Sequence, residues 1–198
     1  MRDSEISMAE DLQTVRARLG VHFNKGGSIR DQCLFAAMCL ALPHAPDGLV
    51  TQIDVAVEGD DITVTDNGPG VSLGDNPATG NPVAQDLMSV IGACGEHKQN
   101  ARYSELLCGI SLAEVNAISS SGSFVTMIDG TAYAQKYILG SPSAPFKEVN
   151  RESPGTRIRF SLDKRWAGNE RFDIVAVENQ VRRLGIDLSK VTINFSAS

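Results

Sequence analysis

Apolar and polar residues alternate in several parts of the chain, and this alternation predicts β-strands. In residues 53–58, Ile53, Val55 and Val57 recur at every second position, as in a strand with one buried face. Residues 62–65 repeat the pattern after a short glycine-containing turn, so we expect the two segments to form a hairpin. Further strands are expected at residues 124–128, 132–138, 157–162 and 191–195.

Apolar residues at helical spacing predict helices between these strands. Residues 29–42 are almost wholly apolar after Gln32, which is typical of a buried helix, and Pro43 should end it. Residues 68–82 are rich in glycine and proline and should form a loop. Other helices are expected over residues 83–93, 106–119 and 172–184, and through Leu12, Val15 and Leu19 after the capping-box pair Ser7 and Glu10.

The order of these elements defines the expected fold. Strands interleaved with a few helices predict an α+β fold, a two-layer sandwich in which a mostly antiparallel (mixed) sheet carries helices on one face. The chain has 198 residues, enough to bury a proper core, and we expect residues 1–198 to form a single domain.

Composition narrows the class of protein. Hydrophobic residues make up 42% and charged residues 21%, as in an ordinary soluble protein, and the net charge of −6 argues against nucleic-acid binding. No signal peptide or membrane-spanning run is visible, so a cytoplasmic protein without a membrane partner is expected, with a monomer favoured. The cysteines lack metal-ligand spacing and should be reduced and buried; they are Cys33, Cys39, Cys94 and Cys108.

The most informative motif is Asp66-Asn67-Gly68-Pro69-Gly70, directly after the predicted strand at residues 62–65. Glycines two and four positions after the carboxylate allow the backbone to turn tightly and approach a ligand, and leave Asp66 facing that ligand. Asp-Asn-Gly between apolar runs is also a good generic turn, in which Asp66 would only cap the turn. The motif alone therefore leaves both interpretations open.

Other short motifs follow one another along nearly the whole chain. They are residues 12–20, Asn76-Pro77 with Gly80, Ala93-Cys94-Gly95, Gly109 with Val115-Asn116-Ala117, Ser143-Ala144-Pro145, and Pro154 to Phe160. Together with the Asp66 motif, they resemble in the same order the ATPase domain of DNA gyrase B and of its topoisomerase IV counterpart, of the GHKL superfamily. The resemblance implies the Bergerat-type fold and a divergent, stand-alone homologue of that domain.

The resemblance also implies a ligand site. In the family, the aspartate of the motif hydrogen-bonds the adenine amino group and a strand threonine assists it; the matching residues here are Asp66 and Thr156. The expected ligand-binding residues are Asp66, Gly68, Gly70, Val71, Thr156, Phe35, Met38, Cys39, Leu87, Leu107 and Gly109. An adenine nucleotide is the candidate cofactor.

The catalytic positions of the family are not kept. Its buried helix carries Glu-x-x-x-Asn, where glutamate activates water and asparagine holds Mg²⁺. Phe35 and Cys39 fall at these positions, and neighbouring registers supply no carboxylate or amide either. We therefore expect no ATP hydrolysis and no Mg²⁺.

The phosphate lid departs from the family as well. Its Gly-x-x-Gly-x-Gly run becomes residues 106–111 here, with Gly109 as the one glycine kept, and Glu105 nearby should repel phosphate. Two family arginines correspond to Pro69 and Ala134. The second domain of the family, with its phosphate-sensing lysine, is not expected in this chain.

Three functions remain open from the sequence. The first is binding of an adenine nucleotide, or a similar purine or aromatic ligand, without hydrolysis. The second is a pocket reused by a small-molecule enzyme of specialised metabolism, an isomerase, cyclase or hydrolase, with Asp66 as its acid or base. The third is a non-catalytic module that interacts with gyrase or acts as its decoy.

Overall fold

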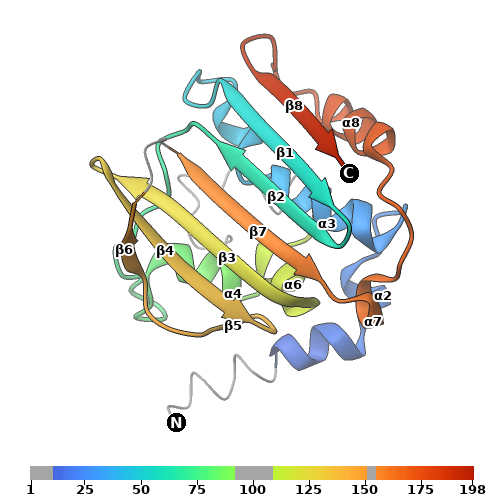
Figure 1. Cartoon of the computed structure of the whole chain (residues 1–198), viewed down its shortest axis with the longest axis horizontal. Coiled ribbons are helices and arrows are strands. Elements are labelled where there is room, and N and C mark those ends of the chain that lie inside the picture. Colours follow the sequence, from blue (N-terminus) through green and yellow to red (C-terminus); the bar gives the residue numbers. More distant parts are fainter. Residues whose placement is uncertain (1–10, 92–108, 151–154) are drawn as a thin grey trace.

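The computed structural model describes residues 11–91, 109–150 and 155–198, which form one mixed sheet with helices packed against it (Figure 1). The strands are β1 (Gln52–Glu58), β2 (Asp61–Asp66), β3 (Ser119–Ile128), β4 (Thr131–Ile138), β5 (Ser141–Pro142), β6 (Lys147–Val149), β7 (Thr156–Leu162) and β8 (Thr192–Ala197). The helices are α2 (Leu19–His22), α3 (Ile29–Met38), η1 (Leu42–His44), α4 (Val83–Ser89), α6 (Leu112–Ala117), α7 (Lys164–Ala167) and α8 (Ile174–Arg183), and residues 11–17 are also helical.

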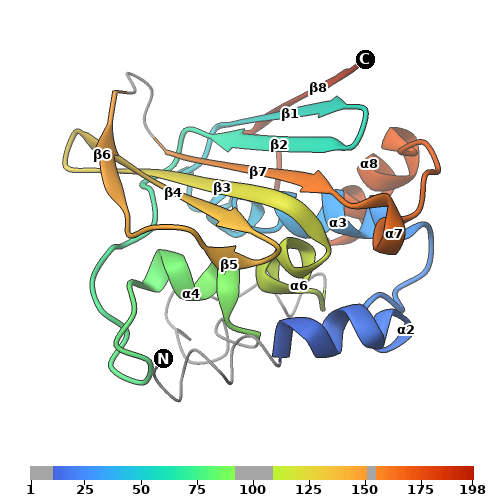
Figure 2. The ribbon, with the colours of Figure 1, turned by 60° about the horizontal axis from the view of Figure 1, so that its bottom comes forward.

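The strand order is β5-β4-β3-β7-β2-β1-β8, and β6 also pairs with β4. Among these strands only the β1–β8 pair is parallel; the others are antiparallel. The helices lie on one side of the sheet (Figure 2). The predicted α+β sandwich with a mostly antiparallel, mixed sheet is therefore confirmed.

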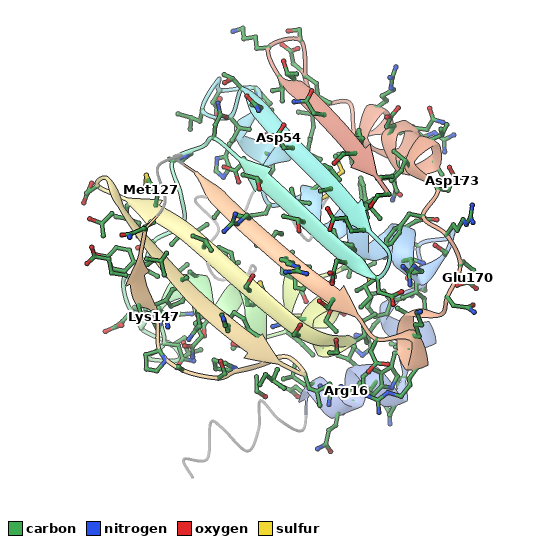
Figure 3. All side chains as sticks on the ribbon, viewed as in Figure 1. Arg16, Asp54, Met127, Lys147, Glu170 and Asp173 are labelled. Atoms are coloured by element: carbon green, nitrogen blue, oxygen red, sulfur yellow. The ribbon has the colours of Figure 1, made fainter. Side chains whose placement is uncertain are left out.

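The two faces of the sheet follow the alternation seen in the sequence. Ile53, Val55 and Val57 of β1 are buried against the helices, as is every second residue of β2 and β7. The opposite face is largely polar; Figure 3 shows side chains projecting from it, including Asp54, whose carboxylate accepts a hydrogen bond from Asn194 at 2.7 Å. One core cluster joins the sheet to α3, α4, α6 and α8.

Two predicted helices are shorter than expected. The helix at residues 29–42 ends at Met38, because Cys39 caps it with a backbone N–H that bonds carbonyls of the preceding turn. Pro43 then lies inside the short 3-10 helix η1, near its start, where its missing N–H costs no hydrogen bond. The helix predicted over residues 106–119 begins at Leu112 and ends at Ala117, because Ser119 already belongs to β3.

Other boundaries moved less, and some elements were missed. The helix at 83–93 ends at Ser89, and the helix at 172–184 begins at Ile174 after its cap, Asp173. The short elements β5, β6 and α7 were not predicted, because two to four residues carry no readable period. The proposed capping box at Ser7 and Glu10 lies outside the described residues.

Arg16 fastens the amino-terminal helical segment to the body of the domain. Its guanidinium donates to the carbonyls of Ala117 at 2.7 Å and Leu139 at 2.5 Å, and it lies 5.1 Å from the centre of the Trp166 ring. Burial, with a smaller contribution from Arg165, lowers the pKa of Arg16. The contact places the end of α2 beside α6, which matters for the site described next.

Candidate functional site

Asp66 is the last residue of β2, and it is only 6% exposed. One carboxylate oxygen, Oδ1, accepts from the backbone N–H groups of Gly68 at 2.8 Å and Thr156 at 3.3 Å. The other, Oδ2, accepts from the Thr156 hydroxyl at 2.5 Å. A carboxylate offers roughly four acceptor positions, and three are used here. One position on Oδ2 remains for a further donor.

The glycines around Asp66 are required by close packing of the backbone. Gly70 has φ +78°, and a Cβ there would lie 2.2 Å from the carbonyl oxygen of Met127. A Cβ at Gly68 would meet Val50 at 2.7 Å, and one at Gly155 would lie 2.0 Å from the carbonyl oxygen of Asp66. These contacts hold the turn after β2 against β3 and β7. The same glycines thus fix the orientation of the Asp66 carboxylate.

The loop that follows is held at two points. The Thr126 hydroxyl accepts from the Val71 N–H at 2.7 Å and donates to the Val71 carbonyl at 3.1 Å. Further along, the Asp86 carboxylate of α4 is fully buried and accepts from the side chains of Asn76, Thr79 and Asn81. Asn76 thus anchors the loop to α4. The polar network around Asp86 has a structural role in shaping the loop.

The buried helix α3 presents apolar groups where the family carries its catalytic pair. Phe35, Met38 and Cys39 are each at most 1% exposed and belong to the core. Burial raises the pKa of the nearby Cys33 thiol far above its usual range, so Cys33 is a neutral core residue.

The polar side chains of α3 lie near its start and are engaged locally. Asp31 accepts from the backbone N–H of Asp173 at 2.8 Å. Gln32 accepts from Lys25 N–H at 3.1 Å and donates to the carbonyl of Gly27 at 3.4 Å. Neither side chain replaces the glutamate of the family by a described contact with Asp66.

A carboxylate occupies the start of helix α6. Ser111 and Glu114 form a capping box: the Glu114 Oε2 atom accepts from the Ser111 N–H at 2.5 Å and from its hydroxyl at 2.8 Å, and the Ser111 hydroxyl accepts from Glu114 N–H at 3.2 Å. The other oxygen, Oε1, lies 2.6 Å from Nδ1 of His22. Ser111 stands at the position of the third glycine of the phosphate lid. A backbone N–H that could bind phosphate there is therefore bound to the chain's own carboxylate.

The structure brings some of the expected site residues together and leaves others apart. Asp66, Gly68 and Thr156 form one hydrogen-bonded group, and Gly70 and Val71 pack beside it on β3. Leu87 of α4 is half-buried, and Gly109 is exposed just before α6. Leu107 and Glu105 lie outside the described residues, as does the rest of the expected lid at residues 92–108.

Several residues of the site are missed by sequence reasoning. Their residue types favour solvated surface positions for His22 and Glu114, yet Glu114 is 8% exposed and the two are in contact. The Ser111-x-x-Glu114 spacing is a capping-box signal that could have been read from the sequence. Thr126 carries no comparable signal, because its contact with Val71 spans 55 residues.

Metal sites and membrane helices can be examined only in the described ranges. Within residues 11–91, 109–150 and 155–198 there is no group of three or more His, Cys, Asp or Glu side chains placed to hold a metal ion. None of the helices in these ranges combines the length and the apolar character that crossing a bilayer requires.

The strand order, the Asp66–Thr156 pair and the glycine-bound turn define a nucleotide-binding fold of the GHKL type. Comparison with known proteins narrows this class to gyrase. The chain is 28% identical to the chloroplastic/mitochondrial DNA gyrase B protein of Oryza sativa over 201 residues, 96% of this chain. It is 30% identical to the DNA gyrase B protein of Metamycoplasma arthritidis over 90% of its length, and 28% identical to that of Haloferax volcanii over 97%.

The chain is thus a divergent gyrase B-like domain. It spans about three-tenths of the length of these relatives: 28%, 29% and 31%. No protein-family model matches it.

Proposed function

We propose that this protein binds an adenine nucleoside or nucleotide, or a similar purine or aromatic compound, without hydrolysing ATP. The observation that carries the proposal is the geometry of Asp66: a buried carboxylate, fixed by three donors, with one acceptor position left. In this proposal residues 1–198 act as one gyrase-B-type domain in the cytoplasm.

The Asp66 end suits a ligand with a hydrogen-bond donor on a flat body. A buried carboxylate needs its acceptor positions filled, so a ligand amino, amide or hydroxyl group stabilises it more than an apolar group does. The side chains of Val71 and Leu87 are half-buried and supply apolar surface nearby. Adenine combines an exocyclic amino group with a flat apolar ring and meets both requirements.

Hydrolysis requires groups that the α3 side of the site does not offer. A general base must hydrogen-bond the attacking water, and Mg²⁺ needs oxygen ligands under the phosphates. Phe35 and Cys39 occupy the matching positions and are buried apolar side chains. We therefore propose that neither ATP turnover nor Mg²⁺ binding belongs to this site.

The α6 side disfavours the triphosphate itself. Glu114 places a negative charge at the helix start and takes up the Ser111 N–H. A phosphate group there would have to displace this carboxylate or lie beside it, and two like charges in a poorly solvated place repel strongly. Adenosine-like and aromatic compounds should therefore bind better than ATP.

A second function is favoured by the His22–Glu114 pair. A carboxylate that fixes one ring nitrogen of histidine leaves the other for proton transfer, as in many general bases. With Asp66 at the other end, the site would hold two acid–base groups, as a repurposed small-molecule enzyme requires. Chemical conversion of a bound purine or aromatic compound, lost in His22→Ala while binding is kept, would favour this function over simple binding.

Calorimetric titration tests the main proposal. Adenosine, ATP with and without Mg²⁺, and an aromatic gyrase-B-site inhibitor are titrated against the wild type, Asp66→Ala and the matched control Asp54→Ala, a carboxylate on the open face of β1. A hydrogen bond to a charged group contributes roughly 1.5–3 kcal/mol, so Asp66→Ala should weaken adenosine binding by about 10- to 150-fold. Asp54→Ala should leave it unchanged.

Asp66 also holds Gly68 and Thr156, so circular dichroism must show that the variant is folded. Asp66→Asn, which keeps the shape of the side chain, replaces it if Asp66→Ala is not. Tight Mg²⁺-dependent ATP binding would overturn the proposal, and so would adenosine affinity that is indifferent to both Asp66 variants.

A further inference from the structure

The two edges of the sheet are built differently. On one side, β4 is followed by two short strands, β5 and β6, which contain Pro142 and Lys147 (Figures 1 and 3). Short strands, proline and lysine are the usual means by which proteins prevent pairing at a sheet edge. On the other side, β8 is the last strand and has six residues, Thr192–Ala197, without charge, proline or glycine. The β8 edge therefore lacks these protections.

Half of the backbone groups of β8 point away from the sheet. The N–H groups of Thr192 and Ser198 donate to the carbonyls of Thr51 and Val57, at 2.9 Å and 3.1 Å. Since the direction alternates along a strand, positions 192, 194, 196 and 198 face β1, and positions 193, 195 and 197 face outward. Ile193, Phe195 and Ala197 thus offer a regular ladder of three N–H and three C=O groups.

A partly apolar hollow lies beside this edge. It has a volume of about 340 Å³ and is lined by Glu178, Val181, Arg182, Leu188, Val191, Ile193 and Phe195. The side chains of Ile193 and Phe195 are half-buried, since α8 covers only part of them. Glu178 and Arg182 lie 4.0 Å apart on α8 and give the rim one charge of each sign.

We propose that β8 pairs antiparallel with β8 of a second copy of this chain, forming a two-fold dimer with a continuous sheet. One register places all three outward-facing residues in pairs: Phe195 lies opposite its own copy on the axis, and Ile193 lies opposite Ala197 in both directions. The two phenylalanine rings then meet across the strands next to the hollow, an aromatic pair of the kind that stabilises sheets.

The charges on α8 are consistent with a second copy as the occupant. A two-fold interface brings the same patch of both copies together and must be self-complementary. Because the rim carries both Glu178 and Arg182, each charge finds the opposite sign on the symmetry copy. A patch of one sign would repel itself. The inference is independent of the ligand site, which lies at Asp66.

Sedimentation velocity of the full chain over a wide concentration range tests the dimer. The expected result is a species of twice the chain mass of 21.2 kDa. Ile193→Lys puts a charge into the hollow and should raise the dimer dissociation constant at least tenfold. Ile138→Lys makes the same change at a position 60% exposed on β4, near the protected edge, and should leave it unchanged. A wild type that stays monomeric throughout, or a dimer insensitive to Ile193→Lys, would overturn the proposal.

Hydrogen exchange on the wild type gives a second test that does not depend on a variant folding. In a dimer, the amides of residues 193, 195 and 197 should be protected at high concentration and exchange faster on dilution, while those of residues 194 and 196 stay protected. Rapid exchange of the three outward amides at every concentration would contradict the proposed pairing.

Discussion

The Asp66 end and the α6 end of the candidate site use their polar groups in opposite ways. At Asp66, three donors from the chain fix a buried carboxylate and leave one acceptor position for something else. At the start of α6, the chain supplies both the N–H donor, from Ser111, and the carboxylate that binds it, from Glu114. The first end is arranged for an external donor, whereas the second satisfies itself.

This difference explains how one fold can keep ligand recognition without the chemistry. The turn at Asp66 is required by backbone packing at Gly68, Gly70 and Gly155, so most changes there would disturb the sheet. The phosphate end depends on side chains projecting from α3 and on the free N–H groups before α6. Those can be exchanged for Phe35 or capped by Glu114 while the helices remain in place.

The largest expected effect is on hydrolysis. We expect no ATP turnover above the uncatalysed background, because general-base catalysis alone contributes about 10²–10⁴-fold and no base or Mg²⁺ ligand stands at Phe35 or Cys39. Phosphate release at saturating ATP and Mg²⁺ measures it. A clear rate that disappears in Asp66→Asn would mean that another carboxylate, such as Asp31, serves as base, and the contrast between the two ends would be wrong.

The contrast can also be tested through stability at position 35. Phe35 is 1% exposed, so Phe35→Glu would lose its packing and bury a charge, and we expect a destabilisation of roughly 3–5 kcal/mol or more. Phe35→Leu serves as the apolar control and should cost much less. Urea unfolding monitored by circular dichroism measures both. If Phe35→Glu were as stable as Phe35→Leu, position 35 would face water, as in a site that still receives phosphate.

Much of the fold could be read from the sequence, because the strands carry a strong period of two. The β1–β2 hairpin, β4 and β7 begin and end within one residue of the prediction. Helix ends were less accurate. An apolar run shows that residues 29–42 are buried, but the capping at Cys39, which ends α3, leaves no mark in hydrophobicity.

The candidate site divides in the same way. The pairing of Asp66 with Thr156 follows from motifs that the chain shares with DNA gyrase B, although 90 residues separate them. The contact between His22 and Glu114 has no such motif and spans 92 residues. A charged residue is ordinarily solvated, so only the packing of α2 against α6 reveals that Glu114 is buried.

The smallest expected effect concerns the preference between adenosine and ATP. Glu114→Gln removes the negative charge at the start of α6 but keeps a side chain that can complete the capping box, so the helix should remain intact. A charge at a helix start is worth roughly 0.3–1 kcal/mol. We therefore expect ATP affinity to rise by about 2- to 5-fold, with adenosine affinity unchanged. Titration of both ligands against the wild type and Glu114→Gln measures the ratio, and Glu148→Gln on β6, far from α6, is the control. Because the loss of a general charge would affect both variants alike, only a change confined to Glu114→Gln supports the role of its carboxylate. An unchanged ratio would mean that the phosphates of bound ATP do not approach α6, and that the two ends of the site do not serve one ligand.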